Sequence, residues 1–73
     1  MDTQEQQVAL LVRRIDGLKR SREQHWKDAR NAIEEGNLNQ AITLLNAYFF
    51  LEDELIMAEG QLKGILKGRY TDR

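Results

Sequence analysis

The stretch EEGNLNQ, residues 34–40, is the only internal site in the chain where signals for a helix end and a helix start coincide. Gly36 can adopt the left-handed conformation that follows a helix end. Asn37 is a preferred N-cap residue, and Gln40 follows three positions later, as in a capping box. The stretch therefore predicts a turn at residues 36–37, between a first helix over residues 3–35 and a second over residues 38–69.

The segment before the turn repeats its apolar side chains at steps of three and four, which is typical of one helix face. Thr3, with Gln6 three residues later, provides the start signal. The stripe has two polar members near its middle and consists of Val8, Leu11, Ile15, Leu18, Arg22, His25, Ala29 and Ala32. Three further apolar residues flank it on one side: Val12, Trp26 and Ile33.

The segment after the turn carries a more complete stripe, in which every member is apolar. It consists of Ala41, Leu44, Tyr48, Leu51, Leu55, Ala58, Leu62 and Ile65. Steps alternating between three and four residues are the heptad pattern of a long helix pair. We therefore predict an all-α fold, a single antiparallel helical hairpin over residues 1–73. Its internal seam is expected to include Trp26, Tyr48, Leu51 and Leu55.

Charge is segregated along the chain, although the formal net charge is only −1. Residues 13–30 hold seven basic and three acidic side chains, whereas residues 38–59 hold four acidic side chains and no basic one. A reversal at residues 36–37 places residues whose numbers sum to 73 or 74 opposite each other. The expected pairs are Trp26 with Tyr48, Arg22 with Glu52, and Arg14 with Glu59. The two oppositely charged segments are thus expected to lie side by side.

A second apolar face on the second helix lies out of reach of the first helix. We call it the outer face, and it consists of Ile42, Leu45, Phe49, Phe50, Ile56 and Met57, with Leu38 at its edge. Burying one large apolar side chain stabilises a protein by ~1.5–3 kcal/mol, so such a face favours a binding partner. Either two copies of the chain pair into a four-helix bundle, or a different protein covers the face.

Length and composition narrow the class of protein. The chain has 73 residues and contains no cysteine and no proline, so we expect one small domain without disulfides or cysteine-based zinc. The acidic, polar start MDTQEQQ is unlike a signal peptide, and the apolar runs are too short to span a bilayer. We therefore expect a soluble cytoplasmic protein that does not enter a membrane.

Candidate catalytic and metal-binding residues are few, and we predict neither an enzyme nor a cofactor or metal site. His25 is the only histidine, and no ligand pattern surrounds it. The Glu-x-x-His motif of carboxylate-bridged metal sites in helical bundles is missing. The segment RRIDGLKR is similar to the start of an all-helical chorismate mutase, but that fold needs a third helix and further basic residues.

The alternative function is that of a homodimeric four-helix bundle that binds RNA, or serves as an adaptor, through Arg13, Arg20 and Lys27. The near-zero net charge and the acidic residues that interrupt the basic segment disfavour nucleic acid. Gly60, Gly64 and Gly68 recur every four residues. They either let a partner backbone approach or weaken the end of the helix, and we favour the second interpretation.

Over nearly its whole length the chain resembles the small co-chaperones of type III secretion needle subunits. The likeness rests on LLVRRIDGLKRSREQ (residues 10–24), the Gly/Asn turn near mid-chain, and LEDELIMAEGQLKGILKGRY (residues 51–70). Within the last segment the matching residues are Leu51, Glu52, Ala58, Glu59, Ile65, Arg69 and Tyr70. The resemblance implies a hairpin that binds a tetratricopeptide-like chaperone, the pair keeping the needle subunit unpolymerised in the cytoplasm before export. It implies no catalysis, metal or cofactor.

Overall fold

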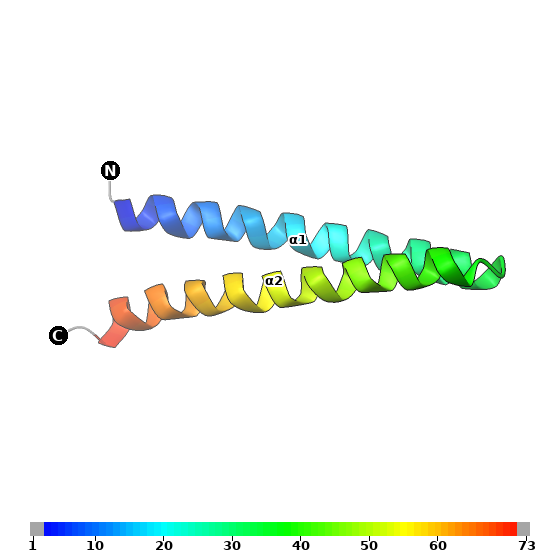
Figure 1. The fold of residues 1–73 in the computed structure, drawn as a ribbon. Coiled ribbons are helices and arrows are strands. Elements are labelled where there is room, and N and C mark those ends of the chain that lie inside the picture. Colours follow the sequence, from blue (N-terminus) through cyan, green and yellow to red (C-terminus); the bar gives the residue numbers. More distant parts are fainter. Residues whose placement is uncertain (1–2, 72–73) are drawn as a thin grey trace.

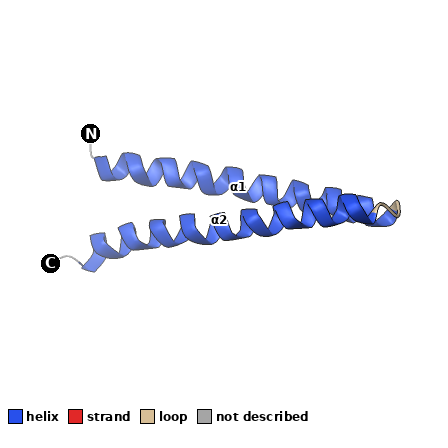
Figure 2. Cartoon of the chain, in the orientation of Figure 1, coloured by secondary structure: helices blue, strands red, loops and turns tan. Residues whose placement is uncertain are grey.

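Two long helices make up the fold, as the computed structural model shows for residues 3–71, with side chains described for residues 3–68. Helix α1 spans Thr3–Glu34 and helix α2 spans Leu38–Thr71, and the two run antiparallel (Figures 1 and 2). The molecule is rod-like, with extents of 57 × 20 × 12 Å. The predicted all-α hairpin is confirmed. Helix α1 ends one residue earlier and α2 two residues later than predicted. The side chains of Arg69 and Tyr70, two of the residues that carry the resemblance, lie outside the described part.

The turn has the geometry that its sequence predicts. Gly36 adopts a φ of 78°, in the left-handed region. Its N–H donates to the carbonyl of Ile33 at 3.0 Å, and the N–H of Asn37 donates to the carbonyl of Ala32 at 2.8 Å. These two bonds form a Schellman motif, which satisfies the last carbonyls of α1. The side chain of Asn37 then accepts a hydrogen bond from the N–H of Gln40 at 3.2 Å, which caps α2.

Both predicted stripes line the seam, and all of their members are buried or half-buried. The buried residues are Ile15, Ala29, Ala32, Ala41, Leu55 and Ala58. The three alanines nearest the turn let the helices approach closely there, since the distance between packed helices depends on the contacting side chains. Farther from the turn, Ile15, Leu55 and the half-buried Leu18 and Leu62 fill the seam. The helices accordingly diverge toward their free ends (Figure 1).

The predicted register holds at the middle of the hairpin. The Trp26 and Tyr48 rings lie 5.9 Å apart, between ring centroids. Arg22 and Glu52 form an ion pair with a hydrogen bond. The basic segment of α1 therefore lies beside the acidic segment of α2.

The predicted pair of Arg14 with Glu59 was wrong. Arg14 contacts Glu54 at 3.4 Å, and Glu59 lies 4.0 Å from the Nζ of Lys19. The reason is the side of the seam on which each residue lies. Arg14 and Glu54 each precede a seam residue, whereas Lys19 and Glu59 each follow one. The two ion pairs therefore flank opposite sides of the seam.

Candidate protein-binding surface

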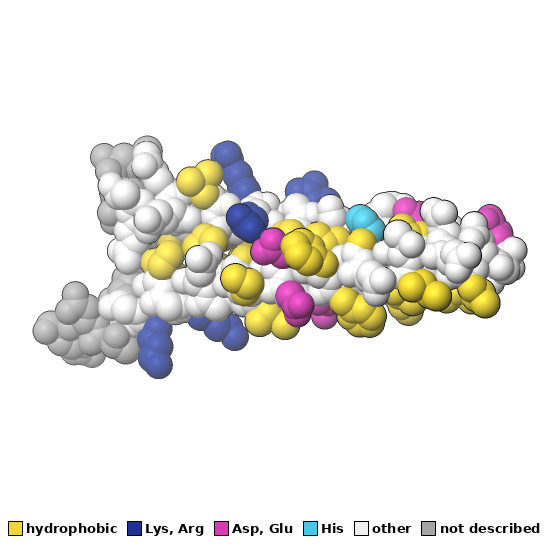
Figure 3. All heavy atoms as spheres, viewed as in Figure 1, with side chains coloured by type: hydrophobic (Ala, Val, Ile, Leu, Met, Phe, Trp, Pro, Cys, Tyr) yellow, Lys and Arg dark blue, Asp and Glu magenta, His cyan; other side chains and the backbone are white. Residues whose placement is uncertain are grey.

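The outer face of α2 is exposed in the hairpin. Its large side chains are exposed by 57% (Ile42), 59% (Phe49), 64% (Phe50), 65% (Ile56) and 66% (Met57). Leu45, which the sequence also assigns to this face, is half-buried. Figure 3 shows hydrophobic side chains gathered along the α2 edge of the molecule, with acidic side chains among them.

Helical periodicity arranges the exposed side chains in two lines. Ile42, Phe49 and Ile56 are spaced seven residues apart, which is nearly two full turns, so they lie almost directly above one another. Phe50 and Met57 form a second line by the same spacing. A helix with one apolar face on its partner and another on its outside cannot be covered by one neighbour alone.

Aromatic contacts extend this surface across the hairpin onto α1. The Tyr48 ring contacts Trp26 at 5.9 Å on one side and Phe49 at 5.6 Å on the other, the second contact being edge-to-face. Trp26 is 49% exposed, so its assignment to the internal seam needs correction. It lies at the edge of the seam and joins the outer face through Tyr48.

Ile33 and Leu38 belong to the same side of the molecule and are 51% and 62% exposed. Ile33, Trp26 and Lys19 are spaced by seven residues on α1, and the contact of Lys19 with Glu59 fixes which side they occupy. In the sequence, Trp26 and Ile33 flank the apolar stripe of α1, because each directly follows a stripe residue. This position could have shown that Trp26 is not inside the seam.

Charged side chains lie at the edge of this surface, next to Trp26. A groove of about 520 Å³ is lined by Lys19, Arg20, Arg22, Glu23, Trp26, Tyr48 and Glu52. The hydrogen bond to the Glu52 carboxylate raises the pKa of Arg22 above its ordinary value. Arg22 is therefore charged at any physiological pH, and the ion pair holds the two helices in register beside the aromatic contacts.

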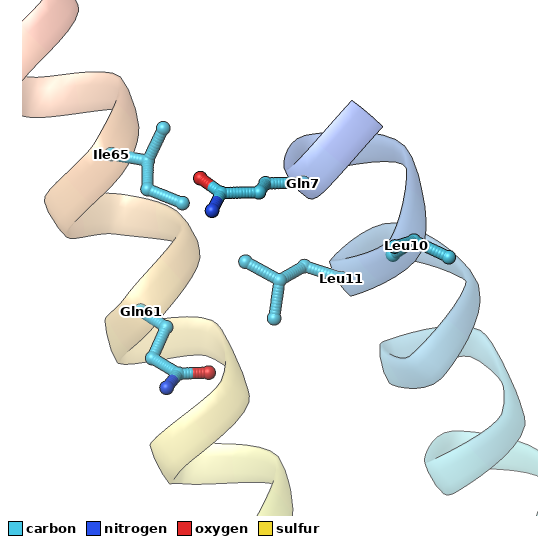
Figure 4. A pocket seen from close by; sticks show the side chains of 5 residues that line it. All are labelled: Gln7, Leu10, Leu11, Gln61 and Ile65. Carbon is cyan, nitrogen blue, oxygen red and sulfur yellow. The ribbon is translucent and has the colours of Figure 1, made fainter. Parts of the chain in front are cut away.

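A second hollow lies at the open end, where the helices diverge. It has a volume of about 480 Å³ and is lined by Gln7, Leu10, Leu11, Gln61 and Ile65. In Figure 4 the side chains of Gln7 and Leu11 on α1 point toward Ile65 and Gln61 on α2. None of the outer-face residues lines this hollow, so the two features are separate.

The other candidate residues, for metal or nucleic-acid binding, do not form a cluster in the part of the chain that the structure describes. His25 is half-buried, and its Nδ1 lies 2.7 Å from the carbonyl oxygen of Ser21. Within residues 3–71 no three His, Asp or Glu side chains gather as they would around a metal ion. Arg13, Arg20 and Lys27, the residues of the nucleic-acid alternative, are exposed on α1, and Lys27 pairs with Glu23 at 3.7 Å.

Over the described residues, neither helix contains a stretch long and apolar enough to span a membrane. Comparison of the chain with protein-family models, with curated proteins and with solved structures finds no match.

Proposed function

We propose that the chain is a non-enzymatic co-chaperone that docks its outer face on a tetratricopeptide-like chaperone in the cytoplasm. Together the two proteins keep a type III secretion needle subunit soluble and unpolymerised before export. The observation that carries the binding role is the set of large apolar side chains on α2 that are more than half exposed. The resemblance of residues 10–24 and 51–70 to the needle co-chaperones supports the choice of partner.

The exposed surface fits the concave groove of a helical repeat protein better than a flat partner. Its two lines of side chains lie on one convex helix, and an amphipathic helix typically binds by laying its apolar face into a groove. Aromatic residues are enriched among the few interface residues that contribute most of the binding energy. Phe49 and Phe50 are more than half exposed, and Trp26 is about half exposed.

The test is a pull-down of the tagged chain from the native bacterial cytoplasm, followed by mass spectrometry. We expect a tetratricopeptide-like chaperone and a small needle subunit to co-purify. Binding to that chaperone should depend little on salt, because the contact is mainly apolar. Co-purification of RNA, with binding that weakens steeply as salt rises, would instead favour the nucleic-acid alternative. Recovery of the chain alone would contradict the proposed partner.

A further inference from the structure

We propose that Asp53 lies at the centre of the interface with the chaperone and pairs there with a basic side chain in the middle of the chaperone's apolar groove. This inference rests on the proposed function and deepens it, because it names the chemistry that selects the partner. Asp53 is an exposed residue of α2. Two features distinguish it, namely the apolar residues that surround it on the helix and the lack of an ion pair to α1 within the described residues.

Large apolar side chains surround Asp53 on the surface of α2. The neighbours of a residue on a helix surface are those three and four positions away. For Asp53 all four positions are occupied by residues of the outer face, which are Phe49, Phe50, Ile56 and Met57. These four side chains are between 59% and 66% exposed. Asp53 therefore lies between the two lines of exposed side chains.

The other acidic residues in this part of α2 have partners on α1. Glu52, Glu54 and Glu59 each form an ion pair with a basic side chain of α1. Glu52 and Glu54 flank the seam on its two sides, so Asp53, which stands between them in the sequence, faces away from α1. It forms no ion pair with any residue whose side chain the structure describes. The charges of α1 thus compensate three of the four carboxylates in residues 52–59 and not that of Asp53.

A partner that covers both apolar lines also covers Asp53, because the carboxylate stands between them. Burying a charge alone is costly, whereas an opposite charge that is hydrogen-bonded to it compensates for the lost water. A basic side chain in the chaperone's groove provides this compensation. Arginine suits the position best, since its planar guanidinium binds a carboxylate through two hydrogen bonds and arginine is enriched at interfaces. Charge complementarity therefore selects a groove that is apolar along two lines and positive between them.

The same carboxylate disfavours other partners. A wholly apolar groove would fit the four surrounding side chains but leave Asp53 buried without a partner, and an acidic groove would repel it. Asp53 is thus a determinant of specificity, whereas Phe49 and the other apolar residues of the outer face provide the contact area.

Substitution of Asp53 gives opposite results with and without such a basic side chain. Calorimetry measures the affinity of the full chain for the chaperone that co-purifies with it. We expect Asp53→Asn and Asp53→Leu each to weaken binding by about 30-fold or more, because each leaves the chaperone's basic group buried and unpaired. Without that group, Asp53→Leu should strengthen binding, since it removes the cost of burying a carboxylate.

Asp28→Asn is the matched control for these variants. Asp28 is an exposed acidic residue of α1, and the hollow that it lines contains no residue of the outer face. The substitution should leave the affinity for the chaperone unchanged. Circular dichroism in urea should show that the hairpin remains folded in every variant, because Asp53 makes no ion pair within it.

A charge reversal identifies the chaperone's side chain. We expect Asp53→Lys to abolish binding, and the replacement of one basic residue of the groove by glutamate to restore it. A scan of the groove's basic residues without any such rescue would overturn the inference. So would an unchanged or higher affinity of Asp53→Leu while Phe49→Asp still abolishes binding, a result that leaves the proposed function intact. Binding that Phe49→Asp also leaves unchanged would instead contradict the proposed function, and this inference with it.

Discussion

Replacing Phe49 by aspartate separates the folding of the hairpin from its binding. The Phe49 side chain is 59% exposed, so about two-fifths of its surface is buried within the hairpin. Full burial of such a side chain stabilises by ~1.5–3 kcal/mol, which gives ~0.6–1.2 kcal/mol for the buried part. Its edge-to-face contact with Tyr48 adds ~0.5–1.5 kcal/mol. The isolated chain should therefore lose about 1–2.5 kcal/mol of unfolding free energy and remain helical.

Binding should suffer more than folding. The exposed three-fifths of the ring is worth ~0.9–1.8 kcal/mol to whatever covers it. Covering an aspartate instead leaves a carboxylate without a partner, which costs at least ~1–3 kcal/mol. The sum corresponds to a loss of affinity of about 25-fold or more, since 1.4 kcal/mol is tenfold. Calorimetry with the co-purified chaperone measures the affinity, and circular dichroism in urea measures the stability.

Leu10→Asp is the matched control for this substitution. Leu10 is 63% exposed, nearly as much as Phe49, but it lies on α1 and outside the outer face. It should leave the affinity for the chaperone unchanged. Loss of helicity in Phe49→Asp would place Phe49 in the hairpin core and refute the assignment of this face. Equal losses of affinity in Phe49→Asp and Leu10→Asp would refute it as well.

Three further substitutions test the hairpin itself. Leu55→Ala should lower the unfolding free energy by ~2–5 kcal/mol, because Leu55 is only 2% exposed. Ile56→Ala should lower it far less, because Ile56 is 65% exposed. Equal urea midpoints for the two variants would contradict the assignment of Leu55 to the seam. Gly36→Ala should cost ~1–2 kcal/mol, since a side chain is strained in the left-handed region, and an unchanged midpoint would exclude the Schellman turn. Arg14→Ala should lower the unfolding free energy by at most ~1 kcal/mol, because its ion pair with Glu54 is exposed. A larger loss in the same urea titration would show that this ion pair stabilises the hairpin more than exposed pairs usually do.

The sequence predicts the hairpin well because its determinants are local. The left-handed Gly36 and the Asn37 cap depend only on neighbouring backbone groups, and the observed bonds are those expected from these residue types. The seam follows from periodicity, which needs no knowledge of the partner helix. The sum of residue numbers then gives the register, as the contact of Trp26 with Tyr48 confirms.

What the sequence does not give is the side of the seam on which a flanking residue lies. Summing residue numbers treats each helix as a line, whereas Arg14 and Glu59 lie on opposite flanks of the contact. The same simplification placed Trp26 inside the seam, although a residue directly following a seam position is turned partly outward. Its 49% exposure brings α1 into a surface that the sequence assigns to α2 alone.

Folding and binding of this chain draw on the same kind of side chain. Among the residues whose side chains the structure describes, four of the six buried ones are alanines, and Ile15 and Leu55 are the only large side chains buried between the helices. The larger apolar groups, Phe49 and Phe50 among them, remain mostly outside, so the hairpin alone gains little to offset the entropy of ordering its backbone. A partner that covers them binds the folded chain and not the unfolded one, and therefore raises its stability by mass action. The thermal midpoint of the hairpin should accordingly rise with the concentration of the chaperone. Phe49→Asp should abolish that rise while Leu10→Asp preserves it.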